Sequence, residues 1–150
     1  MSTPFRLLVP SEVLAQMIAQ AQAERPNECC GLLAGVAEDG VGRVTARYPL
    51  VNALASPTRY EAELRGLIAA LRDADRRGLE VLALYHSHPT SRPVPSRYDL
   101  ERAYWPNTVM LIVSLETDPP LVRGWWMTET DYHEAEWETA STEGGAVLPP

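Results

Sequence analysis

The sequence of 150 residues contains no lysine, because all 13 of its basic residues are arginine. The protein therefore cannot itself carry a conjugate on a lysine side chain. Basic residues of any kind are also outnumbered, since 20 aspartates and glutamates give a net charge of −7. A nucleic-acid partner requires a basic face to meet its phosphates, so this acidic balance argues against one.

Long apolar runs and cysteines are scarce as well. No window holds 18 consecutive apolar residues, the length that crosses a bilayer as a helix, so we expect no membrane partner. The segment from Met1 to Arg6 lacks the charged and then apolar order of a signal peptide, which favours a cytoplasmic location. The two cysteines, Cys29 and Cys30, are adjacent and poorly placed to bridge each other. We expect free, buried thiols rather than a metal or redox role.

The apolar pattern predicts one α/β domain over residues 1–138, with a mixed β-sheet packed against helices. Helical spacing indicates a helix that opens at Pro10-Ser11 and a second that contains Leu64 to Leu71 and closes at Gly78. A short helix is expected from Ser96. Strands are expected at residues 5–9, 28–36, 43–51, 81–88, 108–115, 121–128 and 132–138. The small and polar composition after residue 138 predicts a disordered tail over 139–150.

Two histidines flank one small residue at the end of the apolar segment Val81 to Leu84, in the order Tyr85-His86-Ser87-His88-Pro89. Side chains alternate along a strand, so His86 and His88 project to the same side. An isolated pair of this kind occurs by chance on many strands. Asp99 follows eleven residues after His88, far enough for the chain to return and add an oxygen ligand. Two imidazoles and one carboxylate form a three-ligand zinc set with a fourth position left for water, which is typical of catalytic sites.

Ser96 and Asp99 also have the spacing of a helix start. In that interpretation Ser96 is the N-cap and the acid three residues later bonds back to the backbone. This role is compatible with the metal hypothesis, because a helix beginning beside the histidines would hold Asp99 in its first turn.

These residues together resemble the JAMM metalloprotease family, also called MPN-plus or JAB1/MPN/Mov34. Its motif is H-[ST]-H-P, six further residues and S-x-x-D, and the chain matches it from His86 to Asp99 without a gap. The upstream segment Pro26 to Gly35 is similar to the P-x-E-x-C-G-L-L-x-G segment of short prokaryotic members. The segment Asn52 to Glu61 also looks like a connecting region of that subgroup.

The resemblance implies a cytidine-deaminase-like α/β fold and a role for five residues. His86, His88 and Asp99 would bind zinc, Glu28 would move the proton of the attacking water, and Ser96 would donate a hydrogen bond to the oxyanion. The implied activity is a zinc peptidase or isopeptidase. Its implied partner is a ubiquitin-like β-grasp protein, especially a sulfur carrier, cut after a C-terminal Gly-Gly. The oligomeric state stays open.

Two other functions compete with this one. A non-catalytic MPN scaffold usually lacks some of the ligands that are present here. The JAMM-like proteins associated with DNA repair typically carry asparagine between the histidines, where this chain has Ser87.

The remaining candidates are expected to be structural. We expect His133 at the surface, and of the adjacent Trp125 and Trp126 at least one should face outward. The acids Glu61, Glu63 and Asp73 are expected on the solvated face of the second helix. Gly144-Gly145 superficially resembles a cleavage junction, but a flexible tail explains it better.

Overall fold

The structure is a computed structural model that describes residues 4–102 and 105–140. Within these residues it has three helices, α1 (Ser11–Glu24), α2 (Leu64–Arg76) and α3 (Arg97–Arg102). The strands are β1 (Arg6–Pro10), β2 (Cys30–Glu38), β3 (Val41–Leu50), β4 (Glu80–His88), β5 (Val109–Ser114), β6 (Leu121–Met127), β7 (Tyr132–Glu134) and β8 (Trp137–Ala140). No helix in the described ranges is both long and apolar enough to cross a membrane.

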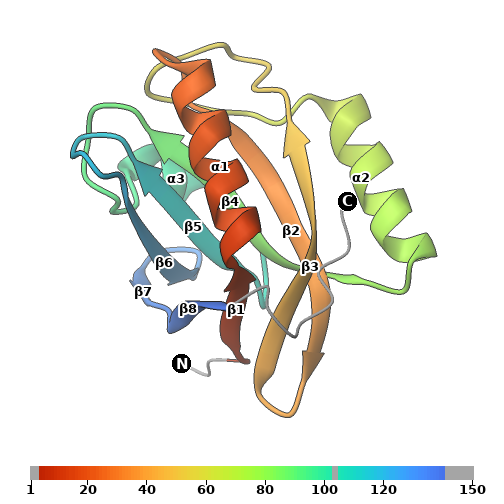
Figure 1. The fold of residues 1–150 in the computed structure, drawn as a ribbon. Coiled ribbons are helices and arrows are strands. Elements are labelled where there is room, and N and C mark those ends of the chain that lie inside the picture. The colour runs from red at the N-terminus through yellow and green to blue at the C-terminus, as the bar shows by residue number, and fades with distance from the viewer. Residues whose placement is uncertain (1–3, 103–104, 141–150) are drawn as a thin grey trace.

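The strands form one sheet in the order β7-β6-β5-β4-β2-β3-β1-β8. The pairs β1–β3, β1–β8 and β4–β5 are parallel and the other neighbours are antiparallel. The expected mixed sheet packed with helices is therefore confirmed. Figure 1 shows α1 lying across one face of the sheet and α2 beside β3.

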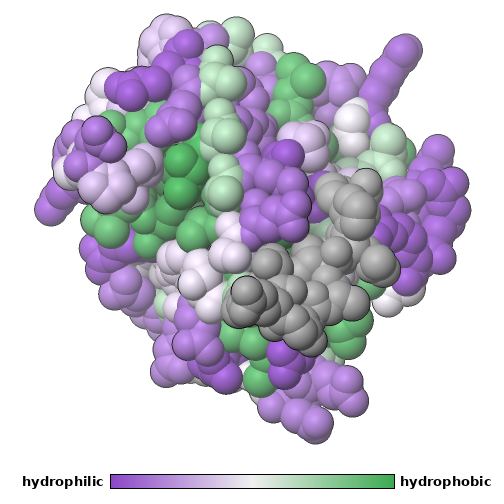
Figure 2. All heavy atoms as spheres, in the orientation of Figure 1, coloured by the Kyte–Doolittle hydropathy of each residue, from purple (hydrophilic) through white to green (hydrophobic). Residues whose placement is uncertain are grey.

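The sheet buries apolar residues on both faces. On the α1 face, Val13 and Met17 of the helix pack with sheet residues such as Leu33 and Leu111. Figure 2 shows this side of the molecule, where most surface residues are hydrophilic and a group of hydrophobic residues lies beside α1. The opposite face carries two separate clusters. One lies under α2, and the other lies under the loop 89–95 and α3. The candidate site lies between these two clusters.

The expected single strand at 132–138 is wrong, because this segment forms two strands at opposite edges of the sheet. Only Ala135 and Glu136 connect β7 to β8. The Ala135 N–H donates to the Gly124 carbonyl, and the Leu7 N–H donates to the Glu136 carbonyl. A two-residue connection can join the two edges only if the sheet curls until they meet. Polar and apolar residues alternate over 134–138, and this local pattern does not say which strand each part of the segment pairs with.

The strand β8 also continues through Thr139 and Ala140, which pair in parallel with Val9 and Pro10 of β1. It thus runs two residues past the expected domain boundary at 138. Residues 141–150, which contain Gly144-Gly145 and the rest of the expected tail, lie outside the described residues.

The expectation that Trp125 or Trp126 faces outward is wrong, because both are buried. Trp126 meets Phe5 edge to face on the α1 side, with ring centroids 5.2 Å apart. Trp125 lies on the other side, where its indole N–H donates to the Pro93 carbonyl at 2.9 Å. The loop 89–95 covers the second face of the sheet, and local sequence pattern does not reveal such a cover.

The three acids expected on the solvated face of α2 have more specific positions. Glu63 is the N-cap of α2, where its carboxylate accepts from the Arg65 and Gly66 backbone N–H groups. Asp73 accepts a hydrogen bond from the Tyr48 hydroxyl at 2.6 Å. Glu61 precedes the helix and lines a cavity beside the site described below.

Candidate metal centre and active site

The site is built where β2 and β4 pair in antiparallel register, with Cys30 opposite His86. One residue further along, the Ser87 N–H donates to the Cys29 carbonyl at 3.1 Å. The Ser87 hydroxyl in turn accepts from the Cys29 N–H at 2.8 Å. The small residue between the two histidines therefore points away from the site and fastens β4 to the start of β2.

Continued two residues before β2, this register brings Glu28 opposite His88, whose charge acts on it. Because side chains alternate along extended chain, Glu28, His86 and His88 share the face that carries α2. His86 is fully buried, and His88 and Glu28 are only 3% and 4% exposed. Two segments separated by more than fifty residues thus contribute to one enclosed polar site.

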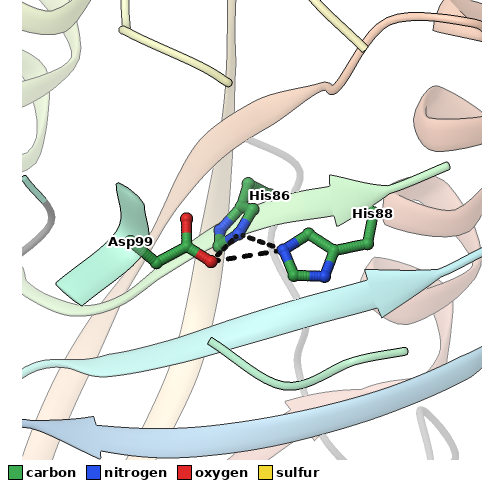
Figure 3. Close-up of side chains that lie close together, drawn as sticks. All are labelled: His86, His88 and Asp99. Carbon is green, nitrogen blue, oxygen red and sulfur yellow. Dashed lines mark hydrogen bonds and ion pairs between the residues drawn. The ribbon is translucent and has the colours of Figure 1, made fainter. Parts of the chain in front are cut away.

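Asp99 reaches the histidines from the first turn of α3. Its Oδ2 atom lies 3.2 Å from the Nε2 atoms of both His86 and His88, and these two Nε2 atoms are also 3.2 Å apart. The three side chains point toward one another from β4 and α3 (Figure 3). Within the described residues, no other group of three or more histidines, cysteines, aspartates or glutamates could hold a metal ion.

The equal spacing fits a cation better than hydrogen bonds. Atoms at the corners of a triangle cannot all be joined by straight hydrogen bonds. A tetrahedral metal with bonds of about 2.0–2.1 Å has ligand atoms about 3.3–3.4 Å apart. The observed separation of 3.2 Å is close to this edge length. The donor set therefore fits a single central metal ion.

The surrounding hydrogen bonds orient His88 toward the same centre. Its Nδ1 atom lies 2.8 Å from the Arg92 carbonyl. Because a carbonyl only accepts, Nδ1 carries the proton and the Nε2 lone pair faces the centre, as in many metal-binding histidines. The carbonyls on either side are also held, that of Ser91 by the Ser114 hydroxyl and that of Pro93 by the Trp125 indole. The loop therefore presents the Arg92 carbonyl at a fixed position.

Ser96 and Asp99 form the expected helix start. The Ser96 hydroxyl accepts from the Asp99 N–H at 3.1 Å, and Asp99 Oδ2 accepts from the Ser96 N–H at 2.9 Å. Burial disfavours the charged carboxylate, but the facing imidazoles of His86 and His88 outweigh it and hold the pKa of Asp99 well below its usual range. Asp99 is thus ionised and has a fixed orientation, as a candidate metal ligand requires.

Two members of the site have a buried polar atom without a hydrogen-bond partner among the described residues, Oε1 of Glu28 and Nδ1 of His86. Burial raises the pKa of Glu28 to about 8, with a smaller opposing effect from His88 and a smaller raising effect from Asp99. An unpaired buried carboxyl beside metal ligands is a candidate proton carrier.

Comparison with known proteins places this site in a family. Residues 10–128 match the prokaryotic homologs of the JAB domain. A desampylase of Haloferax volcanii is 39% identical over 103 residues, covering 68% of this chain and 73% of the relative. A CysO-cysteine peptidase of Mycobacterium tuberculosis is 34% identical over 116 residues, covering 75% of each chain.

The chain belongs to the prokaryotic JAB family. The expected membership of the short prokaryotic JAMM group is therefore confirmed, and the protein is a metallopeptidase. A solved structure of a protein from Desulfitobacterium hafniense matches with a TM-score of 0.82 at 29% identity, over 90% of this chain and 93% of that chain. The JAMM/MPN fold is confirmed as well.

The structure adds Tyr60 and Asn52 to the site of this JAB domain. The Tyr60 ring stacks on the His86 ring, with centroids 4.5 Å apart and planes 23° apart. Its carbonyl accepts from the Tyr98 hydroxyl at 3.0 Å. The sequence contains one sign of this role, because the segment Asn52 to Glu61 resembles a connecting region of the family. No spacing rule relates that segment to His86.

A cavity of about 360 Å³ lies on the face that carries α2. Tyr60, whose ring stacks on His86, and Tyr98, which precedes Asp99 in the sequence, both line it. The lining residues are Cys30, Gly31, Leu32, Leu50, Tyr60, Glu61, Ala62, Leu64, Leu67, Leu84, Tyr98 and Trp105.

The two cysteines and the third histidine do not join the metal group. Cys29 and Cys30 are free and buried, as expected. Burial raises the pKa of their thiols to about 11 and about 12, which keeps both protonated. His133 is half-buried in β7, so it is less exposed than the sequence suggested.

Proposed function

We propose that this JAB-family metallopeptidase uses zinc to hydrolyse a peptide or isopeptide bond after the C-terminal Gly-Gly of a ubiquitin-like β-grasp protein, such as a sulfur carrier. The names of its relatives, a desampylase and a CysO-cysteine peptidase, support this substrate class. A reducing cytoplasm is the proposed location, in agreement with the two free thiols.

One observation carries the proposal. The Nε2 atoms of His86 and His88 and Oδ2 of Asp99 form a triangle with 3.2 Å sides, and the unpaired carboxyl of Glu28 lies on the same buried face. Three ligands leave one position of a tetrahedral zinc open for water or substrate, whereas structural zinc sites fill all four.

We assign the three ligands His86, His88 and Asp99 to zinc. Zinc bound there supplies a Lewis acid that lowers the pKa of a bound water to about 7 and polarises the scissile carbonyl. Glu28 takes one proton from the attacking water and delivers it to the leaving amine, so the carboxyl is regenerated after each turnover. The Ser96 hydroxyl accepts from the Asp99 N–H and keeps its own proton available for the oxyanion.

Crowding around the ligands supports glycine on the acyl side of the bond. The Tyr60 ring covers one face of His86, and Glu28 lies beside His88. A side chain next to the scissile carbonyl would approach both the ligands and Glu28. We expect the β-grasp body, rather than the short tail alone, to provide most of the binding energy.

The test measures zinc content and cleavage together. The wild-type protein should retain about one zinc per chain and lose it to a chelator. His86→Ala combined with His88→Ala should abolish zinc binding, and Asp99→Ala should weaken it. His133→Ala is the matched control, because it removes the third histidine outside the metal group. Cys29→Ala should also leave the zinc content unchanged.

Glu28→Gln should retain zinc and lose cleavage, because an amide cannot accept the proton of water. The substrates are β-grasp proteins of the same organism extended past Gly-Gly, with products identified by mass spectrometry. Full zinc occupancy in the double histidine variant would refute the metal site, and wild-type cleavage by Glu28→Gln would refute the mechanism. Failure to cleave any such protein would remove the substrate class.

A further inference from the structure

We propose that Asn52 is a positioning residue that holds the Glu28 backbone through its side-chain amide. Asn52 lies two residues after β3 and forms an isolated bridge with Ala62 at the other end of the loop 53–61. Asn52 is 8% exposed and is the only asparagine among the buried polar residues in the described part of the chain. The inference rests on the proposed role of Glu28 as the proton carrier.

The Asn52 amide makes four hydrogen bonds, which is an unusually complete set for one side chain. Its Nδ2 atom donates to the carbonyls of Glu28 and Arg59, each at 3.0 Å. Its Oδ1 atom accepts from the backbone N–H groups of Leu54 and Glu61, each at 3.1 Å. One side chain therefore joins Glu28 to both ends of the loop.

The same loop holds Glu28 from the other side. The Glu28 N–H donates to the Ser56 carbonyl at 2.8 Å. Glu28 precedes β2, which starts at Cys30, so its peptide groups lie outside the named sheet pairings and bond to the loop instead. The position of this carboxyl thus depends on a loop whose shape is set by Asn52.

The side chain of Glu28 has no anchor of its own. Its Oε1 atom is buried without a hydrogen-bond partner in the described part of the chain, so the carboxyl is positioned by its backbone and by packing. If the hydrogen bond from Asn52 is removed, the buried Glu28 carbonyl loses this donor. A buried acceptor without a donor costs free energy, so we expect the backbone at Glu28 to move. Hydrogen-bond partners of metal ligands commonly change activity by about 10- to 100-fold, and we expect a loss of the same order for a partner of the proposed proton carrier.

The test uses Asn52→Asp, which keeps the size and the acceptor oxygen but replaces the two N–H donors with a second oxygen and adds a carboxylate charge. Asn52→Ala is the second variant, because it removes the donors without adding a charge, and a loss that both variants share is assigned to the donors. Thr58→Val is the matched control, because Thr58 is an exposed residue of the same loop whose side chain hydrogen-bonds to Ser56 alone among the described residues. Each variant is measured for zinc content, kcat and KM, alone and combined with Glu28→Gln.

We expect Asn52→Asp to lower kcat by about 10- to 100-fold with little change in KM and with full zinc content. In the Glu28→Gln background the same substitution should have no further effect on the residual rate, because a residue that acts through Glu28 loses its influence with it. In the zinc-free protein, hydrogen exchange of the Glu28 amide should become at least about tenfold faster, while the amides of β4 stay protected.

Wild-type kcat in a folded, zinc-loaded Asn52→Asp variant would overturn the inference. So would an equal loss in the Glu28→Gln background, or a loss that follows the zinc content. Unchanged exchange of the Glu28 amide in both Asn52 variants would do the same without any activity assay. Wild-type activity of Glu28→Gln alone would instead refute the proposed function, so the two failures are distinguishable.

Discussion

At the scale of single residues, Glu28 has an environment that opposes the charge its proposed role requires. The carboxyl is buried, and its pKa is raised to about 8 in the absence of a metal. A bound cation would favour the ionised form, since an opposite charge within a few ångströms stabilises a carboxylate. Glu28 is therefore mostly protonated below pH 8 in the metal-free protein, and a bound cation would ionise it for its proposed role as a base.

This gives a prediction for the stability of the metal-free protein. Because the pKa of Glu28 is raised on folding, its contribution to stability is full below about pH 4.5 and is lost as the pH rises toward 8. Glu28→Gln removes this loss, so the variant should gain about 2–4 kcal/mol on the wild type between pH 5 and pH 9. Urea unfolding of both proteins after chelation measures the difference. A constant difference across this range would contradict the raised pKa.

At the scale of elements, the loop 89–95 and the start of α3 set the geometry of the ligands. Three consecutive carbonyls, those of Ser91, Arg92 and Pro93, accept from Ser114, His88 and Trp125. The loop joins β4 to α3, so the same bonds that orient His88 also place the turn in which Asp99 lies. The burial of Trp125 and the orientation of His88 therefore depend on the same loop.

Ser96 at the start of α3 should affect both the helix and the chemistry. Ser96→Ala should destabilise the protein by about 1 kcal/mol through the lost cap. It should also lower kcat by roughly 10²- to 10³-fold, as when one oxyanion donor is removed. Zinc content should stay near the wild-type value, because the bond from the Ser96 N–H to Asp99 comes from the backbone. Kinetics with metal analysis test this, and Ser91→Ala serves as the control. An unchanged kcat would limit Ser96 to the helix cap.

At the scale of the whole molecule, the curled sheet is closed by contacts remote from the metal ligands. β8 joins β1 at the edge opposite β7, and an apolar cluster of eighteen buried residues fills the α1 face. The exposed ion pairs of Arg6 with Glu138 and of Arg123 with Glu134 add little by comparison. Most of the folding free energy therefore comes from burial outside the site.

Metal removal should leave this fold intact. After chelation, far-ultraviolet circular dichroism should keep its native shape at room temperature, and unfolding should stay cooperative. Adding zinc should raise Tm with its concentration, because only the folded state holds the assembled ligands. A chelated protein that is unfolded at room temperature would show that the three-ligand site is a main source of stability.

The sequence by itself determined the elements and most of the candidate site. Strand alternation places His86 and His88 on one face, and the spacing from Ser96 to Asp99 indicates a helix start, since both rules depend only on local backbone geometry. Glu28 came from the resemblance to the JAMM family, because it has no local pattern that relates it to residues sixty positions away.

Only the tertiary structure decided what covers each buried face and which strands meet. The segment 132–138 reads as one strand in the sequence but forms β7 and β8 at opposite edges, because a local pattern indicates burial and not the identity of the partner. Trp126 is buried on the α1 face, and Trp125 is buried on the opposite face because the loop 89–95 covers it. Asn52 donates a hydrogen bond to Glu28, which is 24 positions away in the chain. The Tyr60 ring stacks on His86, which is 26 positions away. Such contacts follow from the packing of distant segments, and no local rule contains them.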